Sequence, residues 1–182
     1  MKILFGFAML ALILTALDAQ ARVGETLPEC ETRYGQPSSL DSKEFPPDFT
    51  RDLGSVYVFH PDGWEIWCCF LDGVCIQQCY RKPLKDTYRM FIVDDEQAII
   101  KEAESGGQAW EQSGSFTFSS TDPKTGFKTD SRSIRWSRPD GTYLTVGNHQ
   151  TQIIVVSPVW YPASQEAQAK ATAKRLAKLK KF

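Results

Sequence analysis

Histidine is scarce in this chain, and the common motifs of hydrolysis, metal catalysis and phosphate binding are missing. Its two histidines, His60 and His149, are far apart, and each adjoins a predicted turn. The sequence contains no HExxH, GxSxG or phosphate-binding glycine loop, and no Cys-x-x-Cys pair of the thioredoxin type. Asp62 and Asp140 each occur in Pro-Asp-Gly, which is ordinary turn chemistry. The sequence therefore predicts a protein that is not an enzyme and that binds no cofactor.

Long apolar runs are also missing after residue 17. The first 21 residues hold Lys2, an apolar run over residues 3–17 and the small-residue ending Ala19-Gln20-Ala21. This order is typical of a secretory signal peptide, whose apolar core is shorter than a membrane span. No cysteine follows the run to accept a lipid. We expect cleavage after Ala21 and a secreted or periplasmic mature protein.

Overall charge is small, but it is unevenly distributed. The chain has a net charge of -1, and its last twenty residues contain six lysine or arginine residues and one glutamate. Residues 22–162 therefore carry a net charge of -6. An acidic body of this kind predicts no general affinity for nucleic acid.

The basic segment, residues 163–182, has the spacing of an amphipathic helix. Its apolar residues recur every three or four positions: Ala169, Ala173, Leu176, Leu179 and Phe182. Such a helix is either a solvated terminal element or a contact for an anionic membrane surface or an acidic partner. The basic residues proposed for that contact are Lys174, Arg175, Lys178 and Lys181.

Two stretches share one pattern of strands and turns. Residues 56–82 indicate three strands separated by Pro61-Asp62-Gly63 and Asp72-Gly73. Residues 134–157 indicate three more, separated by Pro139-Asp140-Gly141 and a Gly147-Asn148 turn. Asp-Gly between alternating apolar residues is a strong hairpin signal, because glycine accepts the positive φ of the turn.

A predicted helix precedes each three-stranded stretch. Thr26 and Glu29 form a capping box for a helix that ends at Tyr34-Gly35. A second helix starts at Asp94 and ends at Gly106-Gly107.

Together these elements predict one α+β domain over residues 22–162. We expect two tandem helix-plus-three-stranded-meander units, about 24–90 and 91–162, that form one antiparallel sheet with helices on one face. Residues 107–133 add length to the second unit, with a polar hairpin tip or loop at their centre.

Several short motifs carry a resemblance. They are Glu31-Thr-Arg33-Tyr34-Gly35-x-Pro37, Gly63-Trp64-x-Ile66, Phe70-Leu-Asp-Gly73-Val-Cys75 and Trp136-x-Arg138-x-Asp140-Gly141. With these motifs the chain resembles a set of uncharacterised small exported bacterial proteins. More distantly, a duplicated helix and hairpin is similar to β-lactamase inhibitory proteins and to BamE-like outer-membrane assembly lipoproteins, whose lipid-attachment cysteine this chain lacks. The resemblance implies an α+β fold and no active site.

Four of the five cysteines lie between Cys68 and Cys79. If Asp72-Gly73 is a two-residue turn, strict pairing places Cys69 opposite Ile76, and Cys68 opposite Gln77. Strand alternation then puts Cys68, Cys75 and Cys79 on one face with Trp64, Ile66 and Phe70. Cys69 and Tyr80 fall on the other face.

Three roles are open for these cysteines. In the first, the cysteines are small buried core residues. In the second, Cys30 forms a disulfide with Cys68, Cys75 or Cys79. In the third, a metal or redox site is formed by Cys68, Cys75 and Cys79. The spacing of the last set matches no common zinc motif. An odd number of cysteines leaves at least one thiol outside any disulfide within the chain.

We expect an exported binding or interaction module whose partner is a protein or an envelope component. Its contact surface would be the exposed sheet face with its Trp, Tyr and Arg side chains, because these residues dominate interface energetics. The alternatives are a thiol or metal-binding protein, and association with membranes through the basic segment.

Overall fold

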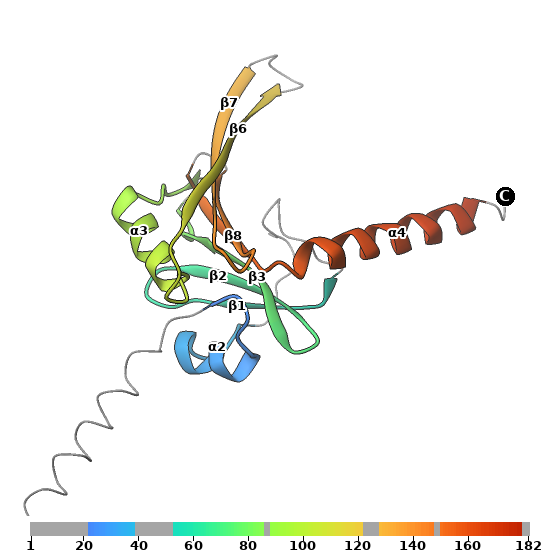
Figure 1. The fold of residues 1–182 in the computed structure, drawn as a ribbon, viewed down its shortest axis with the longest axis horizontal. Coiled ribbons are helices and arrows are strands. Elements are labelled where there is room, and N and C mark those ends of the chain that lie inside the picture. The colour runs from blue at the N-terminus through green and yellow to red at the C-terminus, as the bar shows by residue number, and fades with distance from the viewer. Residues whose placement is uncertain (1–21, 39–52, 86–87, 122–127, 148–149, 180–182) are drawn as a thin grey trace, which may run out of the picture.

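The computed structural model describes residues 22–38, 53–85, 88–121, 128–147 and 150–179. The predicted signal peptide with its cleavage site at Ala21, and also His149 and Lys181, lie outside these residues. The chain is an α+β protein with a seven-stranded antiparallel sheet in the order β1-β2-β3-β9-β8-β7-β6 (Figure 1). None of the helices in the described ranges is both long and apolar enough to span a membrane.

The sheet strands follow the predicted turns closely. They are β1 (Ser55–Phe59), β2 (Glu65–Leu71), β3 (Val74–Arg81), β6 (Glu111–Thr121), β7 (Lys128–Ser137), β8 (Tyr143–Gly147) and β9 (Gln152–Val156). A separate pair consists of β4 (Leu84–Lys85) and β5 (Tyr88–Arg89). Asp72 and Gly73 form the β2–β3 turn with φ values of 52° and 81°, as a tight hairpin turn with two positive φ angles requires.

The two predicted meanders lie side by side and join through their third strands. β3 pairs antiparallel with β9, so β1-β2-β3 continues into β9-β8-β7 as one sheet. The expected single antiparallel sheet is therefore confirmed. The division into two tandem helix-plus-meander units stays a prediction.

Two helices cover one face of the sheet, here called face A. Helix α2 (Leu27–Tyr34) begins with the predicted capping box, in which Glu29 accepts a hydrogen bond from the Thr26 N–H at 2.7 Å. Helix α3 (Asp94–Ala103) begins where predicted and ends three residues before Gly106. Cys30 from α2 and Ile100 from α3 are buried in the same core as Phe59, Leu144 and Val155.

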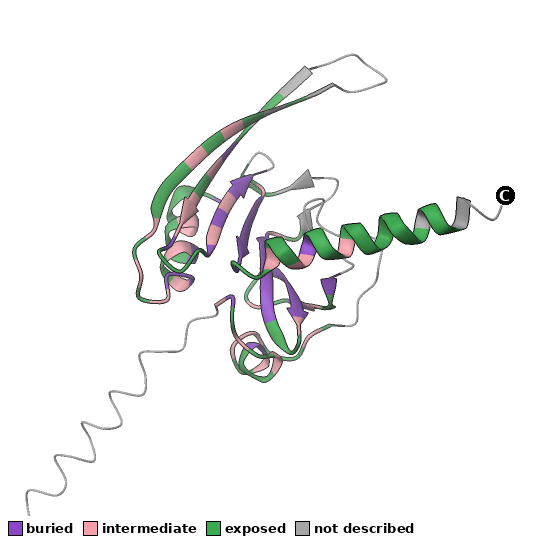
Figure 2. Ribbon diagram, turned by 45° about the vertical axis from the view of Figure 1, so that its right-hand side comes forward, coloured by how far each residue is buried: buried purple, intermediate pink, exposed green. Residues whose placement is uncertain are grey.

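The third described helix, α4 (Trp160–Leu179), starts on the opposite face, face B. Trp160, Ala163 and Ala167 pack against a second core that contains Trp67, Ile76 and Val156. The rest of α4 projects away from the sheet and is exposed along most of its length (Figures 1 and 2). The helix predicted from the basic segment is present, and it begins three residues earlier than expected because Trp160 anchors its first turn.

A β-bulge in the β2–β3 hairpin corrects the predicted register. Phe70 pairs with Cys75 as expected, but Cys69 pairs with Gln77 and Cys68 with Gln78. The extra residue on β3 reverses the faces of all later side chains on that strand. Tyr80 therefore lies in the face A core and Cys79 in the face B core, opposite to the prediction.

The β6–β7 hairpin forms a long arm at one edge of the sheet. Pairing runs from Glu111–Ser137 to Thr121–Lys128, and the arm extends beyond the neighbouring strand β8 (Figure 1). The segment predicted to add length to the second half thus supplies a seventh strand. The polar tip, residues 122–127, lies outside the described residues.

A substitution at Gly54 tests the packing between the start of β1 and strand β2. A Cβ atom at this position would lie far inside van der Waals contact of the Phe70 carbonyl oxygen, which belongs to the backbone. We expect Gly54→Ala to lower the free energy of unfolding by roughly 1–3 kcal/mol, the range for overpacking, as measured by chemical denaturation. Gly114→Ala is the control, because a Cβ there meets no atom within 4 Å. Equal stability of the two variants would contradict this account of the β1–β2 contact.

Candidate functional site

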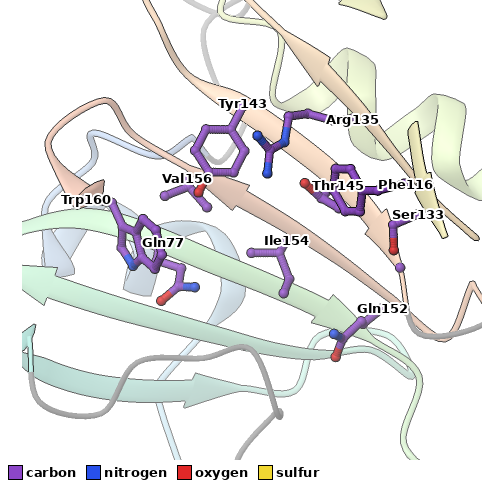
Figure 3. Close-up of a pocket in the computed structure, with 11 residues that line it drawn as sticks. Gln77, Phe116, Ser133, Arg135, Tyr143, Thr145, Gln152, Ile154, Val156 and Trp160 are labelled. Atoms are coloured by element: carbon purple, nitrogen blue, oxygen red, sulfur yellow. The ribbon is translucent and has the colours of Figure 1, made fainter. Parts of the chain in front are cut away.

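An open hollow on face B lies in the angle between the β6–β7 arm and the start of α4. We call it the corner surface and define it by Phe116, Arg135, Tyr143, Thr145, Ile154 and Trp160. These side chains come from five elements and gather on one side of strands β7, β8 and β9 (Figure 3). The cavity measures about 170 Å³, so it is a shallow recess rather than an enclosed chamber.

Arg135 is the charged centre of the corner surface. Its guanidinium carbon lies 5.1 Å from the centre of the Phe116 ring and 4.7 Å from that of the Tyr143 ring. Tyr143 in turn meets Trp160 edge to face, with 6.5 Å between ring centres. Aromatic faces attract a guanidinium and hold its planar donors in a fixed orientation.

Unlike three other arginines, Arg135 has no acidic partner among the described residues. Arg33 pairs with Glu25, Arg81 with Glu65, and Arg138 with Asp140. Arg135 instead is exposed on the outer side of the sheet, with its stacking partners beside it. It can therefore offer bidentate hydrogen bonds to a carboxylate from outside the chain.

The structure brings Cys30, Cys68 and Cys75 together and excludes Cys79 from their group. All three are fully buried in the face A core, and the Cys68 thiol is within hydrogen-bonding reach of the other two. Cys69 and Cys79 are fully buried in the face B core. The predicted set of Cys68, Cys75 and Cys79 therefore does not converge, because the bulge turns Cys79 to the opposite face.

The thiols have the environment of core residues rather than of reactive groups. Burial, together with hydrogen bonds from Cys30 and Cys75, raises the pKa of Cys68 well above its usual value. Burial also raises the pKa of Cys69 to about 12, with a smaller contribution from Cys75. Such thiols stay protonated at neutral pH, whereas nucleophiles and metal ligands are thiolates. Within the described ranges, no group of three or more His, Cys, Asp or Glu side chains is arranged to hold a metal ion.

A buried carboxyl group, Glu104, lies at the end of α3 and was not expected from the sequence. It is fully buried, accepts a hydrogen bond from the Val23 N–H at 3.2 Å, and contacts the Tyr80 hydroxyl. The Tyr80 hydroxyl is also 3.0 Å from the Tyr34 hydroxyl and 3.0 Å from Gln78 Oε1. Burial raises the pKa of Glu104 to about 7, against the lowering effect of the Tyr80 and Val23 hydrogen bonds.

The neutral form of Glu104 allows more hydrogen bonds in this network than the ionised form does. When Glu104 is ionised, Tyr80 donates its one proton to the carboxylate and Gln78 Oε1 receives none from it. When Glu104 is protonated, its O–H donates to Tyr80, and Tyr80 is free to donate to Gln78. The neutral carboxyl thus completes the chain of hydrogen bonds and avoids a buried charge.

A second hollow of about 450 Å³ lies between α2 and α3 on face A. Its lining includes Tyr34, Trp64, Tyr80, Ile99 and Ile100. Two of its charged lining residues are ion-paired, since Glu96 pairs with Lys82 at 2.5 Å and Arg33 pairs with Glu25. The groove also exposes the carboxylate of Asp62, in contrast to the guanidinium of Arg135 on face B.

The other residues singled out from the sequence have structural positions. His60 is exposed and lies 3.1 Å from the Ser38 hydroxyl through Nε2. Asp62 has a φ of 41° in its turn, and Asp140 accepts hydrogen bonds from Arg138 at 2.6 Å and the Thr142 N–H at 2.9 Å. On α4, Lys174 is exposed, while the side chains of Arg175 and Lys178 lie outside the described residues.

A signal for the bulge and the buried network was present in the sequence. Gln77 and Gln78 are adjacent polar residues in the middle of an otherwise apolar strand, which breaks the alternation expected of a regular strand. The structure buries both, one on each side of the sheet: Gln77 lines the corner surface and Gln78 meets Tyr80. No comparable signal marks Glu104, because a glutamate near a helix end is ordinary.

Comparisons of the chain with protein-family models, with curated proteins and with solved structures found no match. The resemblance drawn from the short sequence motifs therefore stays a prediction.

Glu104 predicts an unusual dependence of stability on pH. Its pKa is about 7 in the folded chain and near 4.5 for an ordinary carboxyl group, so the folded state holds the proton more tightly. Its stabilising contribution is complete below pH 4.5 and is lost as the pH rises to 7, by roughly 3 kcal/mol in total. We expect Glu104→Gln to remove this loss from the free energy of unfolding measured by urea denaturation at pH 4.5 and 8.

The matched control for this experiment is Glu102→Gln. Glu102 is exposed near the end of the same helix, so its variant should keep the pH dependence of the parent chain. An unchanged dependence in Glu104→Gln would show that this carboxyl group titrates normally.

Proposed function

We propose that the chain is an exported, non-enzymatic binding module that holds a protein partner on the corner surface. The observation that carries this proposal is the guanidinium of Arg135, which has no acidic partner among the described residues and lies between the rings of Phe116 and Tyr143 in an open recess. Arginine and aromatic side chains supply most of the energy in protein interfaces. Export rests on the signal-peptide pattern of residues 1–21.

The chemistry of the corner surface favours a partner that presents a carboxylate beside an apolar group. None of the described residues that line the recess is acidic, so a carboxylate of the partner would meet Arg135 without repulsion from them. Ile154 and the ring of Trp160 would receive the apolar part. The sheet strands and the stacked rings hold the side chains of the corner surface in place before binding. This reduces the conformational entropy that is lost on association.

The proposed function is tested by comparing how the substitutions Arg135→Ala and Arg132→Ala change the affinity for a partner. Arg132 is an exposed arginine on the same strand, but it does not line the recess and serves as the control. A partner is first cross-linked to the purified chain in an envelope extract, identified and then produced in pure form. We expect Arg135→Ala to weaken its binding tenfold or more in calorimetry, as for a hot-spot arginine.

Arg132→Ala should change the affinity less than twofold. Equal weakening by the two substitutions would indicate only a general charge effect. No weakening by Arg135→Ala would place the partner elsewhere on the molecule. Both results would contradict binding at the corner surface.

A second proposed function is association with an anionic membrane surface through α4. Residues 168–174, 176 and 177 of this helix are exposed (Figure 2). Leu176 is 54% exposed. The one described ion pair of the helix joins Lys170 to Glu166 at 2.7 Å. By their place in the sequence, Lys174, Arg175 and Lys178 are the basic residues proposed to bind anionic headgroups.

Vesicle binding tests the role of α4 without disturbing the core. Deletion of the helix is unsuitable, because Ala163 and Ala167 pack against the sheet. We expect Lys174→Glu to weaken binding to vesicles containing phosphatidylserine on the order of tenfold, since each basic residue near such a surface contributes about 1 kcal/mol. Arg132→Glu, a charge reversal away from α4, should leave binding unchanged. Equal binding of both variants, or binding that does not respond to salt, would contradict this role.

A further inference from the structure

We propose that the chain forms one disulfide bond, between Cys30 and Cys68, and that this bond fastens α2 to the sheet. Both cysteines lie in the face A core, on the side of the sheet opposite the corner surface. The sequence alone leaves Cys75 and Cys79 open as partners of Cys30 as well.

Cys68 is the central thiol of the buried group. All five cysteines are free thiols in the structure, and Cys30, Cys68 and Cys75 are fully buried together in one core. Cys68 interacts with both of the other two. Cys69 and Cys79 lie in the core of the other face, with the sheet between them and this group. A disulfide on face A must therefore come from Cys30, Cys68 and Cys75 alone.

Backbone freedom favours Cys30 over Cys75 as the partner of Cys68. Cys68 and Cys75 belong to neighbouring strands, where they occupy diagonal positions around the bulge. Diagonal residues in a sheet have Cα atoms roughly 7–8 Å apart, at or beyond the span of a disulfide, and the ladder resists the shift that would close it. The residues just before α2 are bridged to β3, since the backbones of Gly24 and Glu25 bond to Cys75. Cys30 itself lies beyond this bridge and makes its backbone bond within the helix, so its position is less constrained by the sheet than that of Cys75.

Existing hydrogen bonds point to the same choice. The Cys75 thiol donates to the carbonyl oxygen of Gln77 at 3.5 Å, within the bulge of its own strand. The Cys30 thiol has only a distant contact with the Glu25 carboxylate, at 4.0 Å. A disulfide from Cys68 to Cys30 therefore breaks a weaker hydrogen bond than one from Cys68 to Cys75.

The reaction is an ordinary thiol–disulfide exchange. The Cys30 and Cys68 thiols lose two protons and two electrons as their sulfur–sulfur bond forms, and an external disulfide accepts them to become two thiols. Such an oxidant, glutathione disulfide or an oxidoreductase disulfide, is present in the compartments that exported proteins enter. Because both thiols are fully buried in the folded chain, the exchange takes place during folding.

The bond would act on the fold through the loop that it closes. It links residues 30 and 68 and so constrains 39 residues of the unfolded chain, against 8 for a bond between Cys68 and Cys75. A longer closed loop removes more entropy from the unfolded state. For a chain of this size we expect oxidation to raise the Tm on the order of 10 °C.

Peptide mapping tests the pairing directly. The reduced full chain is refolded with a mixture of reduced and oxidised glutathione, alkylated and digested without reduction. We expect one linked peptide pair that contains Cys30 and Cys68, with Cys69, Cys75 and Cys79 alkylated. This measurement on the unsubstituted chain does not depend on whether any variant folds.

Two serine variants form a matched pair for the same experiment. Cys75→Ser should keep the disulfide and the rise in Tm, whereas Cys30→Ser should lose both. Circular dichroism of each reduced variant controls for folding. A bond between Cys68 and Cys75, a bond that includes Cys69 or Cys79, or five alkylated thiols in the refolded chain would overturn the proposal.

Discussion

The β-bulge opposite Cys69 and Phe70 determines which side chains of β3 lie on each face of the sheet. One extra residue on β3 turns Tyr80 toward the helices and Cys79 away from them. Without it, a hydroxyl would not reach Glu104, and Cys79 rather than Tyr80 would lie beneath α2. The polar network on face A, and the exclusion of Cys79 from the thiol group there, are consequences of the same irregularity.

Glu104 connects parts of the chain that are distant in sequence. Its carboxyl group binds the backbone of Val23 near the start of the described chain and the hydroxyl of Tyr80 in the central sheet. Its carbonyl oxygen accepts a hydrogen bond from Arg138, which follows β7. Burial raises the pKa values of Tyr34 and Tyr80 well above their usual range, and the nearby Glu104 charge raises them further. These groups are therefore neutral when the network is most stable, which suits a role in holding elements together rather than in transferring charge to a substrate.

The sequence predicts the elements of this fold better than the positions of its side chains. Asp72-Gly73 identifies the β2–β3 turn because its two positive φ angles leave few alternatives, and Thr26 with Glu29 identifies the start of α2 for a similarly local reason. The faces of Cys79 and Tyr80 were assigned wrongly because strict alternation carries no information about an inserted residue. Glu104 was missed because its burial depends on Tyr80 and Val23, which approach it only in the folded chain. The corner surface was expected in kind, as an exposed sheet face with Trp, Tyr and Arg, but not in its location.

The two faces of the sheet differ in which charged side chains they leave accessible to a partner. On face A, several ionisable groups near the core are buried or ion-paired within the chain, as Glu104, Lys82 and Arg33 illustrate. On face B, Arg135 of β7 is exposed, and Tyr143 of β8 is half-buried beside Trp160 at the start of α4 (Figure 3). An arginine that gains stacking, but no counter-ion from the described part of its own chain, would be stabilised further by a carboxylate that a partner supplies. The rigid sheet that places it there, held by the opposite core, is what would make such a contact selective, because a partner must match the fixed spacing of rings and guanidinium.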